Sequence, residues 1–322
     1  MKKLKILQVG AGNKEFRTEF YIKKEFKLLG HSVLTFNDIK IYNLLSFLSH
    51  IFFRIITYLF NPDLIIYSKA KKISIANFQW ANKKYTTIMW YFDIQVPFQN
   101  SILERARRVD IFYITNIGQI PFLTQNGVNA RYLPQACYTD YSYKSNNREY
   151  LYDVSFIGNN NKHMGMREML LKQVSEYYDL HLWGKRWETG TTYTSHERIF
   201  GEKYANVCIR SKIVLDIKSY EYCLLTNGYF SNRVFITLGY GGFLLSQKVK
   251  GKDEIFEDGK HLVYFETQDE LIELIGYYLS HDEEREKIAR QGKEYVLQNH
   301  TYRIRIAQIL DDIKHIQNQR FK

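Results

Sequence analysis

The chain alternates short apolar runs with stretches of helical periodicity, and this alternation limits what it can fold into. In the first part, apolar runs of strand length occur at Lys5–Val9, Ser32–Phe36 and Thr86–Tyr91, and a helical pattern covers residues 15–29. Alternating strands and helices are typical of βαβ units, which form a parallel sheet covered by helices. The pattern therefore predicts a Rossmann-like domain over residues 1–140.

The same alternation resumes after a polar stretch, residues 138–152, which predicts a linker. Beyond it a strand is expected at Asp153–Ile157, and strongly periodic helices follow near the end of the series. A chain of 322 residues has room for two domains of about 150 residues each. We therefore expect a second Rossmann-like domain over residues 150–302, and a last helix, within 303–322, that returns to the first domain.

Composition narrows the class of protein and its partners. The sequence has 45 Lys and Arg against 34 Asp and Glu, a net charge of +11 that favours nucleotide diphosphates, phospholipid surfaces or nucleic acid as partners. An AT-rich genome, in which lysine codons are common, would explain the same excess. Three scattered cysteines fit neither a disulfide framework nor a CxxC metal site, and the first apolar run is too short for a signal peptide. A cytoplasmic protein is expected.

One apolar segment, residues 41–60, has the length of a membrane span. Its polar residues recur every three or four positions, at Asn43, Ser46, His50, Arg54 and Thr57. Such spacing puts them on one face of a helix, and a spanning helix would not keep a polar stripe. We interpret the segment as an amphipathic helix. Its apolar face either packs on the sheet or touches a membrane surface or a lipid-linked acceptor, which would place the protein at the inner face of the membrane.

Two glycine-containing loops, residues 10–13 and 158–161, each join a strand to a helix. The first lacks the third glycine of a dinucleotide fingerprint and is a weak signal for NAD. In both loops, free backbone N–H groups at a helix N-terminus could hold a phosphate; a tight turn alone is the alternative. We assign Gly158 and Asn159 to donor binding, and Gly10, Gly12 and Asn13 to the acceptor or interdomain cleft.

Ser231, Asn232 and Arg233 precede a helical run that stops at Gly241 and Gly242. Ser231 is a good N-cap residue, and Arg233 then lies in the first turn, where the helix dipole disfavours a cation. An arginine there is usually present for an anion, and its fork and the free N–H groups could grip a diphosphate together. A surface pair with a carboxylate is the alternative. We assign all five residues to donor binding.

Acidic residues supply the remaining candidates. Glu254 lies in the loop after a strand, at the edge of the sheet where α/β proteins bind ligands, and could accept hydrogen bonds from a ribose; a solvated acidic loop is the alternative. Asp93 follows the strand that ends at Tyr91 and is the candidate general base, or else a turn residue. Trp90 beside it could offer an apolar face to a sugar. No acidic cluster of DxD type indicates a metal, and none is expected.

A longer pattern covers about 70 residues near the C-terminal end. SNRVFITLGYGGFLL is followed by EIFEDGKHLVYFETQDELIELIGYYLSHDEEREKIARQGKEYVLQNHTYRIR, and weaker matches occur upstream at Trp90–Asp93, Tyr132–Ala136 and Asp153–Asn159. In this order and spacing the pattern resembles the C-terminal region of CgeB-like, family-1-type glycosyltransferases of the GT-B fold. One position departs from it: many relatives have a glutamate where this chain has Ile236, so a ribose-holding role would pass to Glu254 or be absent.

The resemblance implies two facing Rossmann-like domains, with the acceptor on the N-terminal one, the nucleotide sugar on the C-terminal one and chemistry between them. It implies transfer of a sugar to a glycan, lipid-linked or protein acceptor without a metal, because cationic side chains and helix N-termini stabilise the leaving diphosphate. No cofactor is implied, since the nucleotide sugar is a substrate. A DNA-modifying glycosyltransferase, suggested by the net charge, and a non-catalytic nucleotide- or sugar-binding protein, suggested by Ile236, are the alternatives.

Overall fold

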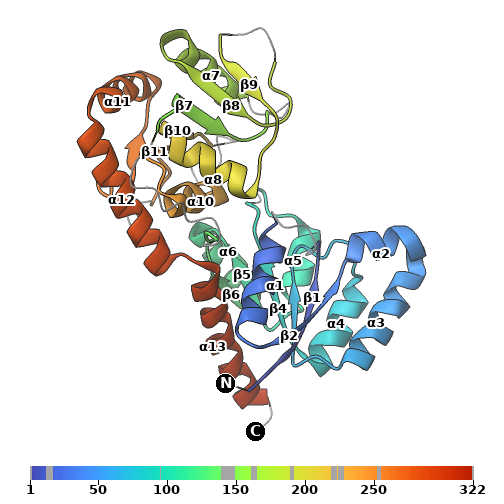
Figure 1. Cartoon of the computed structure of the whole chain (residues 1–322). Coiled ribbons are helices and arrows are strands. Elements are labelled where there is room, and N and C mark those ends of the chain that lie inside the picture. The colour runs from blue at the N-terminus through green and yellow to red at the C-terminus, as the bar shows by residue number, and fades with distance from the viewer. Residues whose placement is uncertain are drawn as a thin grey trace. The chain divides into compact units, whose positions relative to one another are not determined.

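The computed structural model describes residues 2–11, 17–94, 96–138, 149–160, 165–188, 192–218, 223, 228–251 and 255–320. Contacts divide the chain into two compact units (Figure 1). Unit 1 comprises Met1–Pro134 and Tyr302–Lys322, and unit 2 comprises Gln135–Thr301. The last helix therefore belongs to the first unit, as the sequence predicts.

Unit 1 is built on a parallel sheet of six strands in the order β2-β1-β3-β4-β5-β6. The strands are β1 (Lys5–Val9), β2 (Ser32–Phe36), β3 (Leu64–Tyr67), β4 (Thr86–Tyr91), β5 (Ile111–Ile114) and β6 (Ala130–Tyr132). The helices are α1 (Thr18–Leu28), α2 (Asp38–Leu45), η1 (Ser46–Leu48), α3 (Ser49–Phe60), α4 (Ile75–Lys84), α5 (Asn100–Ala106), η2 (Ile117–Gln119), α6 (Ile120–Gln125) and α13 (Tyr302–Arg320).

Both faces of this sheet are covered, which explains why its strands are continuous apolar runs. Side chains alternate along β4, so that Met89 and Tyr91 join the core formed with Phe53 of α3 and Phe78 of α4. Helices α1 and α13 pack against each other, and α13 contacts β4. Asp312 of α13 fixes this packing: its carboxylate accepts a hydrogen bond from Tyr113 Oη at 2.5 Å and pairs with Arg131.

The apolar segment predicted as one helix forms α2, η1 and α3 in succession. Together, Asp38–Phe60 is long and apolar enough to cross a membrane by length and composition, yet it packs on unit 1 along one side. The inward side carries Phe53 and Thr57, and Thr57 satisfies its hydroxyl by donating to the Phe53 carbonyl oxygen at 2.7 Å. The outward side is apolar and exposed, so the predicted packing of the apolar face on the sheet holds for only half of the helix.

Unit 2 repeats the plan with a second parallel sheet of six strands, in the order β12-β11-β10-β7-β8-β9. The strands are β7 (Tyr152–Ile157), β8 (Leu180–Trp183), β9 (Thr194–His196), β10 (Ser211–Asp216), β11 (Leu244–Gln247) and β12 (Val263–Phe265). The helices are α7 (Gly165–Tyr177), α8 (Gly201–Arg210), α10 (Asn232–Tyr240), α11 (Gln268–Ser280) and α12 (Asp282–Asn299). The predicted α/β class with two Rossmann-like sheets is confirmed.

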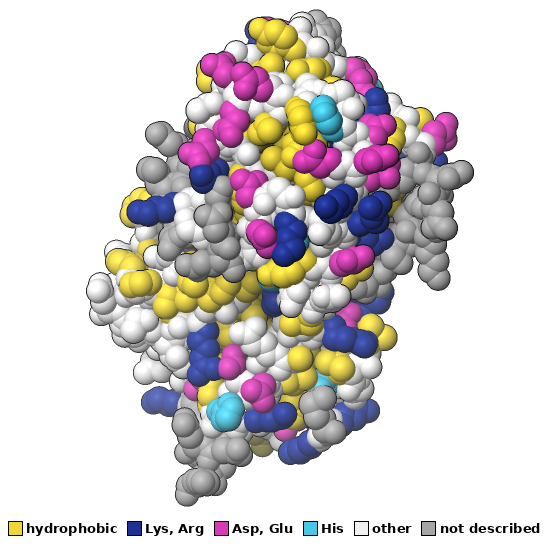
Figure 2. Space-filling view, turned by 90° about the vertical axis from the view of Figure 1, so that its left-hand side faces the viewer, with side chains coloured by type: hydrophobic (Ala, Val, Ile, Leu, Met, Phe, Trp, Pro, Cys, Tyr) yellow, Lys and Arg dark blue, Asp and Glu magenta, His cyan; other side chains and the backbone are white. Residues whose placement is uncertain are grey.

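Two separate cores hold unit 2 together, one on each face of its sheet. Phe156, Leu215 and Leu245 point toward α7 and α11, whereas Val214 and Leu244 point toward α10. Helix α12 packs on both α10 and α11. Over α11 and α12, acidic and basic side chains are interspersed on the outer surface (Figure 2). This mixed surface is typical of a solvated helix face.

Candidate functional site

The strand order of each unit marks one place for a ligand. In parallel α/β sheets, ligands bind at the carboxyl ends of the strands where successive connections leave in opposite directions. In unit 2 this point lies between β7 and β10, and in unit 1 it lies between β1 and β3. The side chains at these two points decide which ligand chemistry each unit can support.

At the point in unit 2, Asp216 at the end of β10 is completely buried and contacts four polar side chains. It pairs with Lys218 and accepts hydrogen bonds from Ser246 Oγ at 3.1 Å and Ser231 Oγ at 3.1 Å. Arg233 Nη1 donates to it at 2.7 Å. Burial opposes ionisation of this carboxyl, but the charges of Lys218 and Arg233 outweigh it and hold the pKa of Asp216 well below its usual range.

Arg233 lies in the first turn of α10, as predicted, and its anion partner in the structure is Asp216. Its Nε also donates to the carbonyl oxygen of Ile157 at 2.7 Å, so one guanidinium joins the ends of β7 and β10. Within the part of the chain that the structure describes, Nη2 has no hydrogen-bond partner. This pair with a carboxylate is the alternative foreseen from the sequence, but it is buried rather than on the surface.

A second arginine, Arg167 in the first turn of α7, was not predicted. It is buried and donates from Nη2 to the Ile217 carbonyl oxygen at 2.8 Å, and its guanidinium lies 5.2 Å from the Phe156 ring. The Arg233 guanidinium lies 4.5 Å from the same ring. Burial, and then the charge of Arg233, lower the pKa of Arg167. Two like charges held this close indicate a site that favours an anion.

Three cationic side chains gather at this point among the described residues. Arg167, Lys218 and Arg233 lie at the carboxyl end of the sheet, and Asp216 pairs with both Lys218 and Arg233. We call these four residues the cationic cluster. Asp216 and Lys218 were not predicted from the sequence. An acidic residue at the end of an apolar strand could have identified Asp216 as a candidate site residue.

Gly158 is required where it stands, because a Cβ there would lie 2.7 Å from Arg233 Nη2 and 2.8 Å from a Phe156 ring atom. It therefore lies beside the cationic cluster, as predicted for donor binding. The side chain of its neighbour Asn159 is occupied differently. Its Oδ1 accepts the backbone N–H of Lys185 at 3.0 Å, which holds the loop after β8. Asn159 thus shapes the loop through its side chain, and its backbone carbonyl accepts from Arg167 at 3.4 Å.

The N-terminus of α10 lacks a side-chain cap. Ser231 occupies the N-cap position, but its hydroxyl donates to Asp216 instead of accepting from the first turn. Ser231 thus has the predicted N-cap position but does not make the capping hydrogen bond, because its hydroxyl is bonded to the Asp216 carboxylate. Asn232, the first residue of α10, has its Oδ1 buried without a hydrogen-bond partner in the structure. An uncapped helix N-terminus and an unpaired amide oxygen together present donors and an acceptor to a ligand.

Two predicted donor residues, Gly241 and Gly242, do not join this cluster. Gly241, with a φ of 88°, ends α10, and Gly242 lies against the Cys208 carbonyl oxygen, 3.0 Å from where a Cβ would be. They precede β11 and so lie at the amino edge of the parallel sheet, opposite the cationic cluster; their assignment to the diphosphate is wrong. Glu254 lies outside the described residues. Ile236, where relatives have a glutamate, is buried on α10.

In unit 1, the loops after β1 and β3 touch at the corresponding point. Gly10 has a φ of 147°, and a Cβ on it would lie 3.1 Å from Ser68, so only glycine allows the two loops to meet. Beside them, Ser68 Oγ and Gln8 Oε1 are buried and have no hydrogen-bond partner among the described residues. Gly10 therefore has the predicted location at a strand end, whereas Gly12 and Asn13 lie outside the described residues.

Asp93 lies near this point and is half-exposed, with its carboxylate 2.5 Å from Lys69 Nζ. Lys69 follows Ser68 and has a φ of 60°, an uncommon value for a residue with a side chain. Glu19 of α1, which was not predicted, is buried nearby. Burial raises its pKa, against the lowering effects of Arg17 and Lys69. Unit 1 thus holds one ionisable carboxylate paired with a lysine and one buried carboxyl at its ligand-binding edge.

Trp90 does not lie at this edge as a sugar platform. The ring is completely buried, its Nε1 donates to the Leu133 carbonyl oxygen at 3.1 Å, and it lies 6.3 Å from the Tyr302 ring of α13. No face of the indole is open to a sugar, so the predicted acceptor contact is wrong. The residue belongs to the core because alternation along β4 turns it toward α13.

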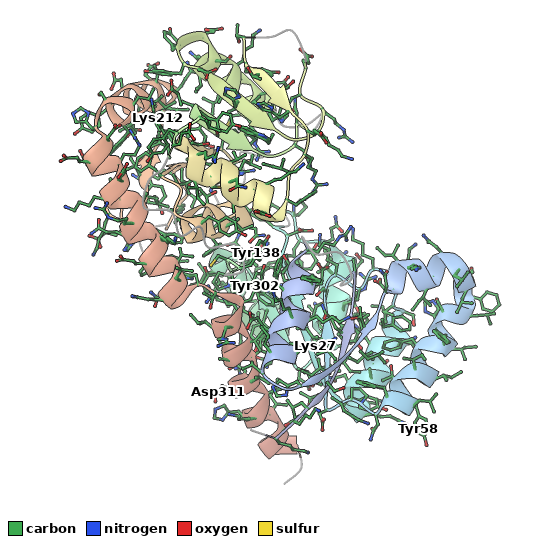
Figure 3. The ribbon with its side chains drawn as sticks, viewed as in Figure 1. Lys27, Tyr58, Tyr138, Lys212, Tyr302 and Asp311 are labelled. Atoms are coloured by element: carbon green, nitrogen blue, oxygen red, sulfur yellow. The ribbon has the colours of Figure 1, made fainter. Side chains whose placement is uncertain are left out.

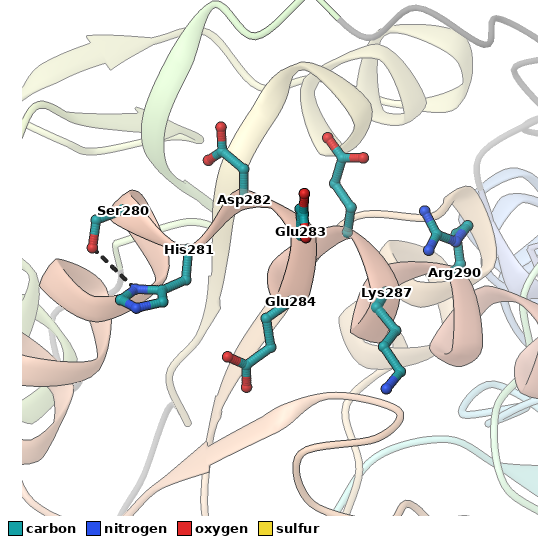
Figure 4. A pocket seen from close by; sticks show the side chains of 8 residues that line it. Ser280, His281, Asp282, Glu283, Glu284, Lys287 and Arg290 are labelled. Carbon is teal, nitrogen blue, oxygen red and sulfur yellow. Dashed lines mark hydrogen bonds between the residues drawn. The ribbon is translucent and has the colours of Figure 1, made fainter.

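The surface also has a hollow at the start of α12, away from these strand ends (Figure 4). Its lining comes from residues 280–290 of one helix and the turn before it, with Glu283, Glu284 and Lys287 projecting from the ribbon. A single helix cannot enclose a substrate, and acidic side chains in a first turn are explained by the helix dipole. Among the described residues, no group of three or more His, Cys, Asp or Glu could hold a metal ion.

Comparison with known proteins agrees with this architecture. Residues 167–311 match the family model described as Glycosyl transferase-like. No curated protein matches the sequence. Among solved structures, sucrose-phosphate synthase from Thermosynechococcus elongatus aligns with a TM-score of 0.73 at 10% identity, covering 98% of this chain and 100% of that one. A glycosyltransferase from Rickettsia africae aligns with a TM-score of 0.73 at 12% identity, covering 98% and 99%.

HepE from Anabaena, in complex with UDP-glucose, aligns with a TM-score of 0.68 at 12% identity, covering 97% of this chain and 100% of that one. At such identities the likeness shows the fold, which is GT-B. These structures confirm the expected GT-B fold. The family match over residues 167–311 confirms the resemblance to family-1-type glycosyltransferases and gives glycosyl transfer as the class of activity. The narrower likeness to CgeB-like sequences stays a prediction.

Proposed function

We propose that this glycosyltransferase takes its sugar from a nucleoside diphosphate donor, and that the cationic cluster of unit 2 binds the diphosphate. The observation that carries the proposal is the gathering of Arg167, Lys218 and Arg233 at the strand ends, beside the uncapped N-terminus of α10. Arg233 is already oriented by Asp216 and Ile157, so it needs little reorganisation to present Nη2 to a phosphate oxygen. Asn232 Oδ1 is available to accept from a ribose or sugar hydroxyl.

The proposed chemistry follows from the charge. When the bond between the sugar carbon and the diphosphate oxygen breaks, the electron pair stays on the diphosphate, whose negative charge rises. Fixed cations and helix N–H groups stabilise that charge most in the transition state. Arg167 and Arg233 provide such cations from the protein itself, and on this ground we propose a reaction that needs no metal and no cofactor.

We propose that unit 1 binds the acceptor at the point where the loops after β1 and β3 meet. The acceptor hydroxyl must lose a proton as it attacks, and a carboxylate held at the edge of the sheet can accept it. Asp93 is the candidate because it is partly exposed and its carboxylate is held by Lys69. Glu19 is less suited to meet an acceptor hydroxyl, since its side chain is buried.

Uridine diphosphate is the first donor nucleotide to test, because the HepE structure with a similar fold holds UDP-glucose. We propose a cytoplasmic protein working on a glycan, lipid-linked or protein acceptor. The test is a thermal-shift screen against UDP-, GDP-, CMP- and dTDP-linked sugars, with a chelator in one arm, since a ligand of the folded state raises the melting temperature. A shift with one nucleotide that the chelator leaves intact supports the proposal. Absence of a shift with every nucleotide sugar would overturn the donor site. A shift that the chelator abolishes would overturn the proposal that no metal is needed.

A further inference from the structure

The outward side of α2, η1 and α3 is an exposed apolar stripe. Its members are Leu44, Phe47, Leu48, Ile51, Ile55, Tyr58 and Leu59, each exposed in the structure. From Leu48 to Leu59 their positions advance by three or four residues, with Tyr58 next to Leu59, which places these five along one side of η1 and α3. Leu44 and Phe47 flank the turn at Ser46, where α2 ends. Leu44 is 80% exposed and Leu59 is 72% exposed, so neither end of the stripe is covered. Figure 3 shows Tyr58 on the outer side of α3.

The fold does not need this stripe for its own core. Helix α3 already packs on the sheet through Phe53, and the side chains partly buried against that core are Phe52, Ile56 and Phe60. Scattered exposed apolar residues are ordinary, but five along one side of η1 and α3, with Leu44 and Phe47 beside the turn before them, are not. The stripe is therefore a surface kept for a partner, and the side chains around it show what kind of partner fits.

Cations lie beside the helices that carry the stripe. The Arg54 guanidinium lies 5.4 Å and Lys84 Nζ 5.6 Å from the Trp80 ring of the neighbouring α4, and Lys72 Nζ lies 4.4 Å from the Tyr42 ring of α2. From residue 38 to residue 93 the sequence has seven Lys and Arg and three acids. Asp38 is buried, Asp63 pairs with Lys2, and Asp93 pairs with Lys69. Cations thus outnumber acids in this part of the surface.

We propose that this stripe docks unit 1 on an anionic lipid bilayer. An apolar helix side with a border of Lys and Arg matches the interface of such a bilayer, where acyl chains lie beside negative head groups. The helix lies along the surface and does not span it, because Phe53 and Thr57 on its other side stay in the core of unit 1. The inference does not rest on sugar transfer, since lipid binding and donor binding are measured separately.

The experiment is sedimentation of the full chain with phosphatidylcholine vesicles, with and without added phosphatidylglycerol. The double variant Phe47→Glu/Leu59→Glu removes two exposed apolar side chains, and Lys83→Glu/Lys84→Glu reverses the charge of the border. Leu28→Glu is the matched control, because Leu28 is 59% exposed on α1, outside the stripe. The melting temperature of each variant, with and without UDP, shows whether it is folded and whether its donor site is intact.

We expect binding to the vesicles that contain phosphatidylglycerol, weakened by added salt. The Phe47→Glu/Leu59→Glu variant should lose about tenfold in partition coefficient for each side chain, and the Leu28→Glu control should bind like the parent chain. Absence of binding to either kind of vesicle, or unchanged binding by the double variant, overturns the proposal. So does a parent chain that is dimeric in solution and becomes monomeric in the double variant, because the stripe would then join two copies.

Depth of insertion gives a second reading. Cys137, Cys208 and Cys223 are buried, so a cysteine introduced by Tyr58→Cys can be labelled selectively with an environment-sensitive fluorophore. Emission of the label at position 58 should shift to shorter wavelength on anionic vesicles, and a label introduced by Leu28→Cys should not. Equal shifts at both positions would contradict docking through the stripe.

Discussion

Arg233 donates through Nη1 to Asp216 Oδ1 across 2.7 Å, and this contact orders the whole carboxyl end of the second sheet. The same guanidinium reaches the Ile157 carbonyl oxygen, so β7 and β10 are linked at the point where their connections diverge. Asp216 thereby orients the Arg233 guanidinium through Nη1, while Nη2 has no hydrogen-bond partner among the described residues. A buried carboxylate is in this way compatible with a site for another anion.

Arg233→Ala should weaken UDP binding by roughly tenfold to a hundredfold, the cost of one charge-assisted hydrogen bond. Arg233→Lys keeps the charge but loses the guanidinium that contacts both strands. Its UDP affinity should lie between that of the parent chain and that of Arg233→Ala. Isothermal titration calorimetry with UDP measures the effect. Equal affinity for parent and Arg233→Ala would rule out Arg233 as a diphosphate ligand.

Asp216→Asn should destabilise unit 2 by about 3–5 kcal/mol, because it leaves the buried ammonium of Lys218 without its counter-charge. Asp216→Asn/Lys218→Met removes both charges and should recover part of the loss. Chemical unfolding curves test the pair, and a double variant no better than the single one would show that the ion pair is not the cause.

The same carboxylate gives a pH dependence. The folded-state pKa of Asp216 is lowered, so its stabilisation is fully present above the unfolded value of about 4 and is lost as pH falls below it. Acid unfolding of the parent chain should therefore be steeper than that of Asp216→Asn/Lys218→Met. Parallel profiles of stability against pH would contradict this assignment.

Gly158→Ala should reduce UDP affinity, because its Cβ would displace the Arg233 guanidinium or the Phe156 ring. Gly165→Ala is the control, since a Cβ there meets nothing within 4 Å. Calorimetry on the two variants separates a local steric effect from a general effect of added alanine. A loss of affinity in both, or in neither, would argue against a donor site beside Gly158.

Asp93→Asn should lower kcat by about a hundredfold or more and leave UDP affinity unchanged, as expected for loss of a general base. Once a donor and an acceptor are known, steady-state kinetics measures kcat, and calorimetry measures UDP binding. Lys69→Met is the companion variant: it keeps the carboxylate but removes the ammonium that holds it from 2.5 Å away, and should lower kcat less than Asp93→Asn does. Full activity of Asp93→Asn would exclude the base.

Sequence patterns were sufficient to predict the strands and helices. They were insufficient to predict which side chains of different elements contact one another. The run Thr86–Tyr91 is a strand because both of its faces are buried, and a continuous apolar run shows this directly. Ile157 lies 76 positions before Arg233, and the two meet because β7 pairs with β10, whose Asp216 holds the same guanidinium. Such a contact depends on strand order, which no local pattern contains.

The errors have the same origin. Gly241 and Gly242 are near Arg233 in the sequence, but a helix of nine residues separates its ends by about 13 Å, which places them at opposite edges of the sheet. In α3 the polar residues do recur with helical spacing, but this spacing does not show which side of the helix faces the core. Thr57 can be buried because its hydroxyl donates to the Phe53 carbonyl oxygen of its own helix, and the apolar residues of the opposite side are exposed.

Because α13 belongs to unit 1, that unit is formed by two separate segments of the chain. Unit 1 can be completed only after unit 2 has been synthesised. During synthesis unit 2 is finished before the residues that cover Trp90 and pair with Tyr113 leave the ribosome. Until then one side of the first sheet is open while the stripe on the other side is already formed. A nascent chain of this kind would present two apolar surfaces at once, which makes the α13 segment the step that decides between a folded product and one captured by chaperones.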